Sequence, residues 1–321
     1  MPTLVFLEHH DGELQKDALG VLSKAVALGD SEVAGAVCGS GLATLPSQAG
    51  AYGAGKVWVA DDAALEAPLP QPRVDVLAKV VREGGYDTVL FAASVLAADV
   101  AAGLAARLDA GLNWDLVDLR REDGRFVGTR PALGDSVYVD VGWKGEPCLA
   151  LIRAGTFEPA AAGGEAEIVE VAVELEEFSG RAEMLEQAHE EQAGPSIEDA
   201  EIIVAGGRGL GSPENFALVE GLAQALGGAV AATRAVVDAG WYPYSAQVGQ
   251  TGKNVSPRLY IACGISGAIQ HKVGMQSSNV IVAINKDANA PIFEFSDLGV
   301  VGDLHQIVPK LTELVQARKG R

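Results

Sequence analysis

The sequence contains few cysteines and few basic residues for its length. Its three cysteines, Cys38, Cys148 and Cys263, are an odd number without a CxxC spacing. This argues against a disulfide framework and against a cysteine-ligated zinc or iron–sulfur site. Lys and Arg number 24 against 43 Asp and Glu, giving a net charge of −19. Because phosphate backbones are bound by basic surfaces, nucleic acid is not expected as a partner.

Long apolar runs, targeting signals and familiar catalytic motifs are also missing. No apolar run approaches the roughly 20 residues of a membrane span. The segment Met1–Glu8 has no positive n-region, and its apolar run is too short for a signal peptide. We therefore expect a cytoplasmic chain without a membrane span. Nucleophile elbow, HExxH and P-loop lysine are absent as well, so we expect no catalytic residue and no metal ligand.

Charge divides the chain into two unequal parts. Residues 1–195 hold 14 Lys/Arg and 32 Asp/Glu, a net charge of −18, whereas residues 196–321 hold 10 and 11, a net charge of −1. An anionic cofactor therefore fits better in the second part. A length of 321 residues allows two domains. An acidic stretch with little apolar periodicity separates them, so we expect an N-terminal domain over 1–185, a linker over 186–200 and a C-terminal domain over 201–321.

Short apolar strands alternate with helical patterns in both parts, which predicts an α/β fold in two domains, each with a mostly parallel sheet flanked by helices. In the first part the expected strands are Leu4–Glu8, Val33–Cys38, Lys56–Ala60 and Thr88–Ala93, with helices at 14–28, 73–84 and 95–109. A strand-rich meander is expected over Phe126–Arg130, Ser136–Trp143 and Cys148–Arg153, with another strand at Ile168–Leu175. In the second part the expected strands are Glu201–Ala205, Ala229–Ala232, 258–263 and 280–284, with helices at 213–226, 267–275 and 304–318.

The densest set of polar groups follows two of these strands. Residues 257–271 predict a strand, a tight turn and a helix that begins near Ser266. A helix start offers unpaired N–H groups and the positive end of a dipole, which suit a phosphate. The next strand ends in Asn285-Lys286-Asp287. Open α/β sheets bind ligands at the carboxyl ends of their strands, which is where these groups are expected.

Other candidate segments each have an ordinary structural alternative. The glycine turn 206–211 could bring Arg208 to a pyrophosphate, or it could be a tight turn with an exposed arginine. Arg234, after a strand, could contact a phosphate or a flavin ring, or could form a surface salt bridge. The loop 247–253 could hydrogen-bond the edge of a heteroaromatic ring, or could be an ordinary turn. His271 on the predicted helix is a ligand candidate, although a lone helical histidine is more often structural.

The segment from Pro257 to Asp297 strongly resembles the signature of the electron transfer flavoprotein alpha subunit. The matching segments are Leu-Tyr-Ile-Ala at 259–262, Gly-Ile-Ser-Gly-Ala-Ile-Gln-His at 264–271, Val-Ala-Ile-Asn-Lys-Asp at 282–287 and Ala-Pro-Ile-Phe at 290–293. The resemblance extends over 201–310 and more loosely over the N-terminal part. It implies an electron carrier, not a stand-alone catalyst of substrate turnover, whose C-terminal domain is Rossmann-like and binds FAD.

The resemblance also implies roles for individual residues. Arg208 should lie near the cofactor's phosphates or adenosine half, Arg234 beside the isoalloxazine ring, and the Thr251 hydroxyl near flavin N5. The full set expected to contact FAD is Arg208, Thr233, Arg234, Gln247, Val248, Gly249, Gln250, Thr251, Ser266, Gly267, Ala268, Ile269, Gln270, His271, Asn285, Asp303 and Leu304. Thr233 stands where the family often has serine, so its contact rests on a weaker match. Arg234, His271 if protonated, and the helix start near Ser266 would stabilise negative charge on the reduced ring.

The implied partners are a beta subunit that carries AMP, flavin dehydrogenases such as the acyl-CoA dehydrogenases of fatty acid beta-oxidation, and a quinone-linked acceptor oxidoreductase. Three alternatives stay open at this point. The chain could belong to an electron-bifurcating flavoprotein that uses NADH, it could be a pyridine-nucleotide enzyme on the same fold, or it could be a cofactor-free scaffold subunit.

Overall fold

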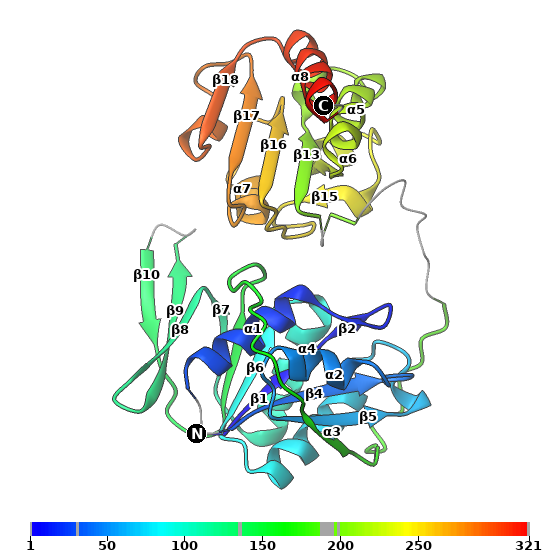
Figure 1. Cartoon of the computed structure of the whole chain (residues 1–321), viewed down its shortest axis with the longest axis vertical. Coiled ribbons are helices and arrows are strands. Elements are labelled where there is room, and N and C mark those ends of the chain that lie inside the picture. Colours follow the sequence, from blue (N-terminus) through cyan, green and yellow to red (C-terminus); the bar gives the residue numbers. More distant parts are fainter. Residues whose placement is uncertain (1, 30–31, 134–136, 187–195, 198–199, 320–321) are drawn as a thin grey trace. The chain divides into compact units, whose positions relative to one another are not determined.

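A computed structural model describes residues 2–29, 32–133, 137–186, 196–197 and 200–319. The chain divides into two compact units, Met1–Gln187 and Ala188–Arg321 (Figure 1). Most of the expected linker, 187–195 and 198–199, lies outside the described residues, as does Ser136 at the start of an expected strand. Among the described residues, no helix combines the length and the apolar character that a bilayer crossing requires.

The first unit is built on a seven-stranded parallel sheet with the order β12-β5-β4-β1-β6-β11-β7. Its strands are β1 (Pro2–Phe6), β4 (Glu32–Gly39), β5 (Lys56–Asp61), β6 (Thr88–Ala92), β7 (Leu112–Leu116), β11 (Cys148–Ile152) and β12 (Glu167–Glu170). Its helices are α1 (Lys16–Ala27), α2 (Leu45–Ala51), η1 (Ala63–Leu65), α3 (Pro70–Gly84) and α4 (Val95–Leu108).

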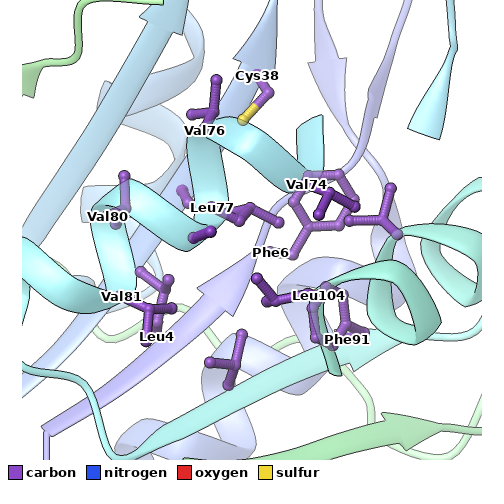
Figure 2. Packing of buried hydrophobic residues seen from close by; sticks show 14 of the residues in the cluster. Leu4, Phe6, Cys38, Val74, Val76, Leu77, Val80, Val81, Phe91 and Leu104 are labelled. Atoms are coloured by element: carbon purple, nitrogen blue, oxygen red, sulfur yellow. The ribbon is translucent and has the colours of Figure 1, made fainter. Parts of the chain in front are cut away.

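Alternation along β1 explains why helices cover both faces of this sheet. Leu4 and Phe6 point to one face, where they pack with Leu77 of α3 and Leu104 of α4 (Figure 2). The residue between them, Val5, belongs to the cluster on the other face, which α1 and α2 complete. A strand buried on both faces reads as a continuous apolar run, which is how the sequence reveals it.

A smaller antiparallel sheet, β10-β9-β8, is formed by β8 (Asp118–Glu122), β9 (Arg125–Ala132) and β10 (Val137–Val141). The short hairpin β2 (His9–His10) and β3 (Glu13–Leu14) follows β1. The expected meander is therefore correct for β9 and β10 but wrong for β11, which pairs in parallel with β6 and β7. The expected strand 168–175 is shorter than predicted, because β12 ends at Glu170.

The second unit carries a six-stranded parallel sheet with the order β15-β14-β13-β16-β17-β18. Its strands are β13 (Ile202–Gly206), β14 (Ala229–Thr233), β15 (Gln247–Val248), β16 (Leu259–Cys263), β17 (Ile281–Asn285) and β18 (Leu298–Val301). Its helices are η2 (Arg208–Leu210), η3 (Pro213–Asn215), α5 (Phe216–Leu226), α6 (Arg234–Val237), η4 (Tyr244–Ala246), α7 (Ile269–Met275), η5 (Pro291–Glu294) and α8 (Leu304–Lys319).

Strand order reverses at β13, because the chain first moves to β14 on one side and later returns to β16 on the other. Helices α5 and α8 lie side by side on one face of the sheet (Figure 1). The opposite face is covered by residues of α7 and η5, including Met275 and Ile292. The carboxyl ends of β13 and β16 thus form a topological switch point, the usual ligand position in an open α/β sheet.

Candidate functional site

Glycines bring the turns after β13 and β16 into backbone contact. Gly207 N–H donates to Cys263 O at 2.9 Å, and Gly209 N–H donates to Gly264 O at 2.9 Å. A Cβ built on Gly207 would lie 2.4 Å from Gly264 O, and a Cβ on Gly209 would lie 2.6 Å from Gly264 Cα. Side chains are therefore excluded at these positions by packing, which leaves two backbone turns side by side at the switch point.

The turn between β16 and α7 leaves several N–H groups without acceptors. Gly264 and Gly267 have φ values of 65° and 88°, in the left-handed region that favours glycine. Among the described residues, the backbone N–H groups of Ser266, Gly267 and Ala268 have no hydrogen-bond acceptor. The predicted helix start near Ser266 is wrong, since α7 begins at Ile269 and has only seven residues. Donors for an anion thus come from an irregular turn and not from the end of a long helix.

A cavity of about 780 Å³ opens at these turns. Its volume falls in the range of roughly 300–1,000 Å³ that ligand sites occupy. It is lined by Gly207, Arg208, Gly209, Thr233, Arg234, Ala235, Asp238, Gly264, Ile265, Ser266, Ala268, Gln270, His271, Asn285, Lys286, Asp287, Ala290, Pro291, Gly302, Asp303, Leu304 and His305.

The carboxylates of this cavity are engaged within the chain. Asp238 pairs with Arg234 at 3.2 Å between Oδ2 and Nε. Asp303 accepts the N–H of His305 at 3.0 Å and so caps the start of α8. Asp287 accepts the N–H of Asn289 at 2.9 Å.

Two cations of the same cavity have no such partner. Among the described residues, Arg208 and Lys286 form no ion pair. Because the neighbouring carboxylates are already engaged, these two side chains are left as counter-charges for an anionic ligand.

Asn285 is partly used in holding the site together. Its side-chain N–H donates to Ile265 O at 2.9 Å, and its Oδ1 accepts the N–H of Asp287 at 3.0 Å. These bonds tie the end of β17 to the turn after β16. An amide carries a second N–H and a further lone pair, so Asn285 can still contact a ligand.

The loop 247–253 borders the cavity without lining it. Gln250 N–H donates to Gln270 O at 2.7 Å. A Cβ built on Gly274 of α7 would lie 2.3 Å from the backbone N of Gly249, so loop and helix meet through their backbones. The Thr251 hydroxyl accepts from Gln247 Nε2 at 3.2 Å, which leaves its hydrogen available to a ligand.

His271 is a buried, neutral side chain. Burial lowers its pKa from 6.5 to about 4, against a smaller raising effect of its hydrogen bond to the Val248 carbonyl. The imidazole therefore carries no charge at neutral pH. The expectation that a protonated His271 helps to stabilise negative charge is not supported by this environment.

The cavity collects many of the residues expected from the sequence. Those that line it are Arg208, Thr233, Arg234, Ser266, Ala268, Gln270, His271, Asn285, Asp303 and Leu304. Those that do not line it are Gln247, Val248, Gly249, Gln250, Thr251, Gly267 and Ile269. Sequence reasoning missed Asp238 and His305, which also line the cavity. Asp238 lies four residues after Arg234, and His305 follows the residue that caps α8. Lys286 and Asp287 were expected at this edge as part of the strand-end run, but not among the FAD contacts.

The described residues hold no cluster of His, Cys, Asp and Glu suited to a metal ion. The three cysteines are free and buried.

Comparisons with known proteins agree with the polar cavity of the second unit. A family model for the electron transfer flavoprotein FAD-binding domain matches residues 196–276. A second model, for the electron transfer flavoprotein domain, matches residues 3–176.

Similar chains are found in bacteria and in a plant. The sequence is 46% identical to the electron transfer flavoprotein subunit alpha of Mycobacterium tuberculosis, over 99% of both chains. It is 43% identical to the same subunit of Mycobacterium leprae, again over 99% of both chains. The mitochondrial subunit alpha of Oryza sativa subsp. indica is 38% identical over 99% of this chain and 91% of its own length.

Proposed function

Because the chain belongs to the electron transfer flavoprotein alpha subunit family, we propose that the cavity of its second unit holds the FAD and that the chain carries electrons between protein partners. The observation that carries this proposal is the run of free backbone donors at Ser266, Gly267 and Ala268 beside an open cavity. Such a run suits the pyrophosphate of a dinucleotide.

The residues of the cavity fit FAD chemically. Arg208 and Lys286, which lack ion-pair partners among the described residues, supply positive charge for the phosphates. Asn285 and Asp303 offer amide and carboxylate groups to the hydroxyls of the ribityl chain and the ribose. Gly207 and Gly209 are in close backbone contact with Gly264, so both turns lack side chains where the pyrophosphate of the cofactor would approach.

When bound, the isoalloxazine ring supplies the redox chemistry. The chain binds and orients it and sets its electrostatic surroundings. Arg234 places a cation in the cavity, and Asp238 partly offsets that charge. The Thr251 hydroxyl has a hydrogen available for a ring nitrogen. His271 contributes a neutral ring, because burial lowers its pKa to about 4.

The wider proposal concerns partners and location. We propose a heterodimer with a beta subunit that carries AMP. We further propose that the pair receives electrons from flavin dehydrogenases, such as those of fatty acid beta-oxidation, and passes them to a quinone-linked oxidoreductase. The relatives named as alpha subunits support the existence of a second subunit. The buried free cysteines fit a reducing compartment, which supports a cytoplasmic location. The proposed domains are 1–185 and 201–321, joined by the linker 186–200.

The test is to copurify the full chain with its beta subunit, record the absorption spectrum, and identify the released cofactors. Yellow protein that releases FAD and AMP supports the proposal, and reduction of the complex by an acyl-CoA dehydrogenase with its substrate supports the donor. Colourless protein that turns over NADH would favour the pyridine-nucleotide alternative. A second FAD per heterodimer would favour the bifurcating alternative.

A further inference from the structure

Tyr260 and His271 form a buried hydrogen-bonded pair in the second unit. Tyr260 lies in β16 and is fully buried, while His271 lies in α7, is buried, and lines the cavity. The Tyr260 hydroxyl lies 3.0 Å from His271 Nε2. The other ring nitrogen, Nδ1, lies 3.1 Å from the carbonyl oxygen of Val248 in β15. The imidazole therefore links strand, helix and loop.

The chemistry of these groups determines where the hydrogens are. A backbone carbonyl only accepts hydrogen bonds, so His271 Nδ1 must carry the hydrogen that it shares with Val248. A neutral imidazole has a single N–H, so Nε2 is an acceptor and the Tyr260 hydroxyl is its donor. Burial lowers the pKa of His271 to about 4 and raises the pKa of Tyr260, so both rings are neutral at pH 7. Only this proton arrangement satisfies both hydrogen bonds.

Val248 lies in the loop 247–253, whose Thr251 hydroxyl the proposed function offers to a flavin ring nitrogen. Its carbonyl accepts from His271, and two residues later Gln250 N–H donates to Gln270 O at 2.7 Å. Consecutive residues of α7, Gln270 and His271, thus hold the loop at two points. If His271 adopted the other tautomer, its Nδ1 lone pair would face the Val248 carbonyl oxygen and this contact would become repulsive.

We propose that Tyr260 is a positioning residue of the FAD site, which acts by holding His271 as the Nδ1–H tautomer and, through it, the loop that begins at Val248. The cofactor part of this inference rests on the proposed function. With both ring nitrogens engaged inside the protein, His271 offers the cavity a neutral, fixed ring and not a cation. A hydrogen bond from either ring nitrogen to the flavin would require breaking one of these bonds.

The tautomer can be measured directly in the unmodified protein. The full chain, labelled with nitrogen-15 histidine, should show for His271 a pyrrole-type Nδ1 and an imine-type Nε2 at pH 7, assigned by through-bond correlations within the ring. A pyrrole-type Nε2 would overturn the proposal. This measurement needs no variant and no cofactor, so it decides the tautomer even if the chain binds no FAD.

The variant Tyr260→Phe removes the donor while keeping the ring. We expect the nitrogen-15 signals of His271 to lose the pure Nδ1–H pattern, and FAD to leave the full chain about tenfold faster, since a buried acceptor is left unsatisfied. Tyr242→Phe is the matched control: its hydroxyl donates to Glu220 Oε1 at 3.3 Å and it does not line the cavity. Unchanged FAD release and unchanged histidine signals in Tyr260→Phe would contradict the proposal.

A double-mutant cycle separates positioning from a general effect on folding. In His271→Asn the amide can still donate toward Val248 O, but the variant has no imidazole whose tautomer Tyr260 could fix. We therefore expect Tyr260→Phe to have no further effect on FAD release in the His271→Asn background. An additional tenfold effect there would show that Tyr260 acts by another route. Wild-type protein that binds no FAD would instead refute the proposed function and leave the tautomer result standing.

Discussion

Both units are built on a parallel sheet, but they differ in the groups that bond to each other at the carboxyl ends of the strands. In the first unit, carboxylates of the chain itself accept hydrogen bonds from donors at these strand ends. Glu8, after β1, accepts from the hydroxyl of Ser94, which is the N-cap of α4. Asp61 at the end of β5 accepts the N–H groups of Gly41 and Leu42 at 2.8 and 3.0 Å. The N–H groups of Gly41, Leu42 and Ala97 are therefore not available to an anion.

In the second unit the corresponding donors remain available. The N–H groups of Ser266, Gly267 and Ala268 have no acceptor among the described residues, and Arg208 and Lys286 have no ion-pair partner there. The net charges of −18 and −1 for residues 1–195 and 196–321 point the same way. In the second unit the carboxylates of the cavity bond to other groups, so the donors of the turn at 266–268 stay available to an anionic cofactor at the carboxyl ends of the strands.

The largest expected effect comes from Gly267→Ala. Gly267 has a φ of 88°, and a Cβ would lie 2.2 Å from the backbone N of Ile292. Left-handed strain and the clash together should lower the free energy of unfolding by about 4 kcal/mol and abolish FAD retention. Urea unfolding and cofactor content measure both. Gly240→Ala is the control, because Gly240 has a φ of 71° but nothing within 4 Å of its Cβ; equal losses in the two variants would refute the packing argument.

The next effect is a pH dependence that His271 gives to the second unit. Its pKa is about 4 in the folded chain, below the ordinary value of 6.5 that we expect in the unfolded chain. Between these values the unfolded chain binds a proton that the folded chain does not, so stability is full above pH 6.5 and is lost as the pH falls toward 4. The loss should reach roughly 3 kcal/mol. The free energy of unfolding, measured with urea at several pH values in this range, should change less with pH in His271→Asn than in the unmodified chain. An equal pH dependence in the two proteins would contradict the burial of a neutral imidazole.

A smaller effect is expected for Arg208→Ala. Loss of a charged donor to a phosphate should weaken FAD binding roughly tenfold and reduce its dependence on salt. The matched control is Arg258→Ala, since Arg258 is exposed, lies 3.8 Å from Glu201 and does not line the cavity. Titration of the deflavinated full chain with FAD compares them; equal affinities would remove Arg208 from the site.

The smallest effect is expected for Ser94→Ala, at the carboxyl ends of the strands in the first unit. Ser94→Ala removes the N-cap hydrogen bond to Ala97 N–H, which measures 2.9 Å, and should cost about 1 kcal/mol of stability. FAD content should not change. Ser47→Ala serves as control, because the exposed hydroxyl of Ser47 only donates to Thr44 O. A loss of FAD in Ser94→Ala would break the contrast between the units.

The fold was largely readable from the sequence where strands are buried on both faces. The continuous apolar runs of β1, β6, β13 and β16 mark such strands. The seven-residue helix α2 was missed, because it contains proline and glycine and is too short for a periodic signal. Likewise β11 was assigned to the meander, because its parallel pairing with β6 depends on contacts distant in sequence.

The sequence predicts many of the residues that line the cavity, but not the backbone geometry of the turn before α7. Motif and strand ends identified Arg208, Ser266 and Asn285, which all line the cavity. The late start of α7 was not predictable, because Gly264 and Gly267 adopt positive φ under contacts with Gly209 and Ile292. The protonation state of His271 stays open from the sequence for a similar reason, because the burial that lowers its pKa comes from tertiary packing.

Amide hydrogen exchange of the full chain, with and without FAD, tests the contrast between the two edges most directly. We predict that FAD slows exchange at Ser266, Gly267 and Ala268, where free donors lie beside the cavity. We predict no direct change at Gly41, Leu42 or Ala97, whose N–H groups already donate to Asp61 and Ser94. Slower exchange at the edge of the first unit, with none at 266–268, would contradict this prediction.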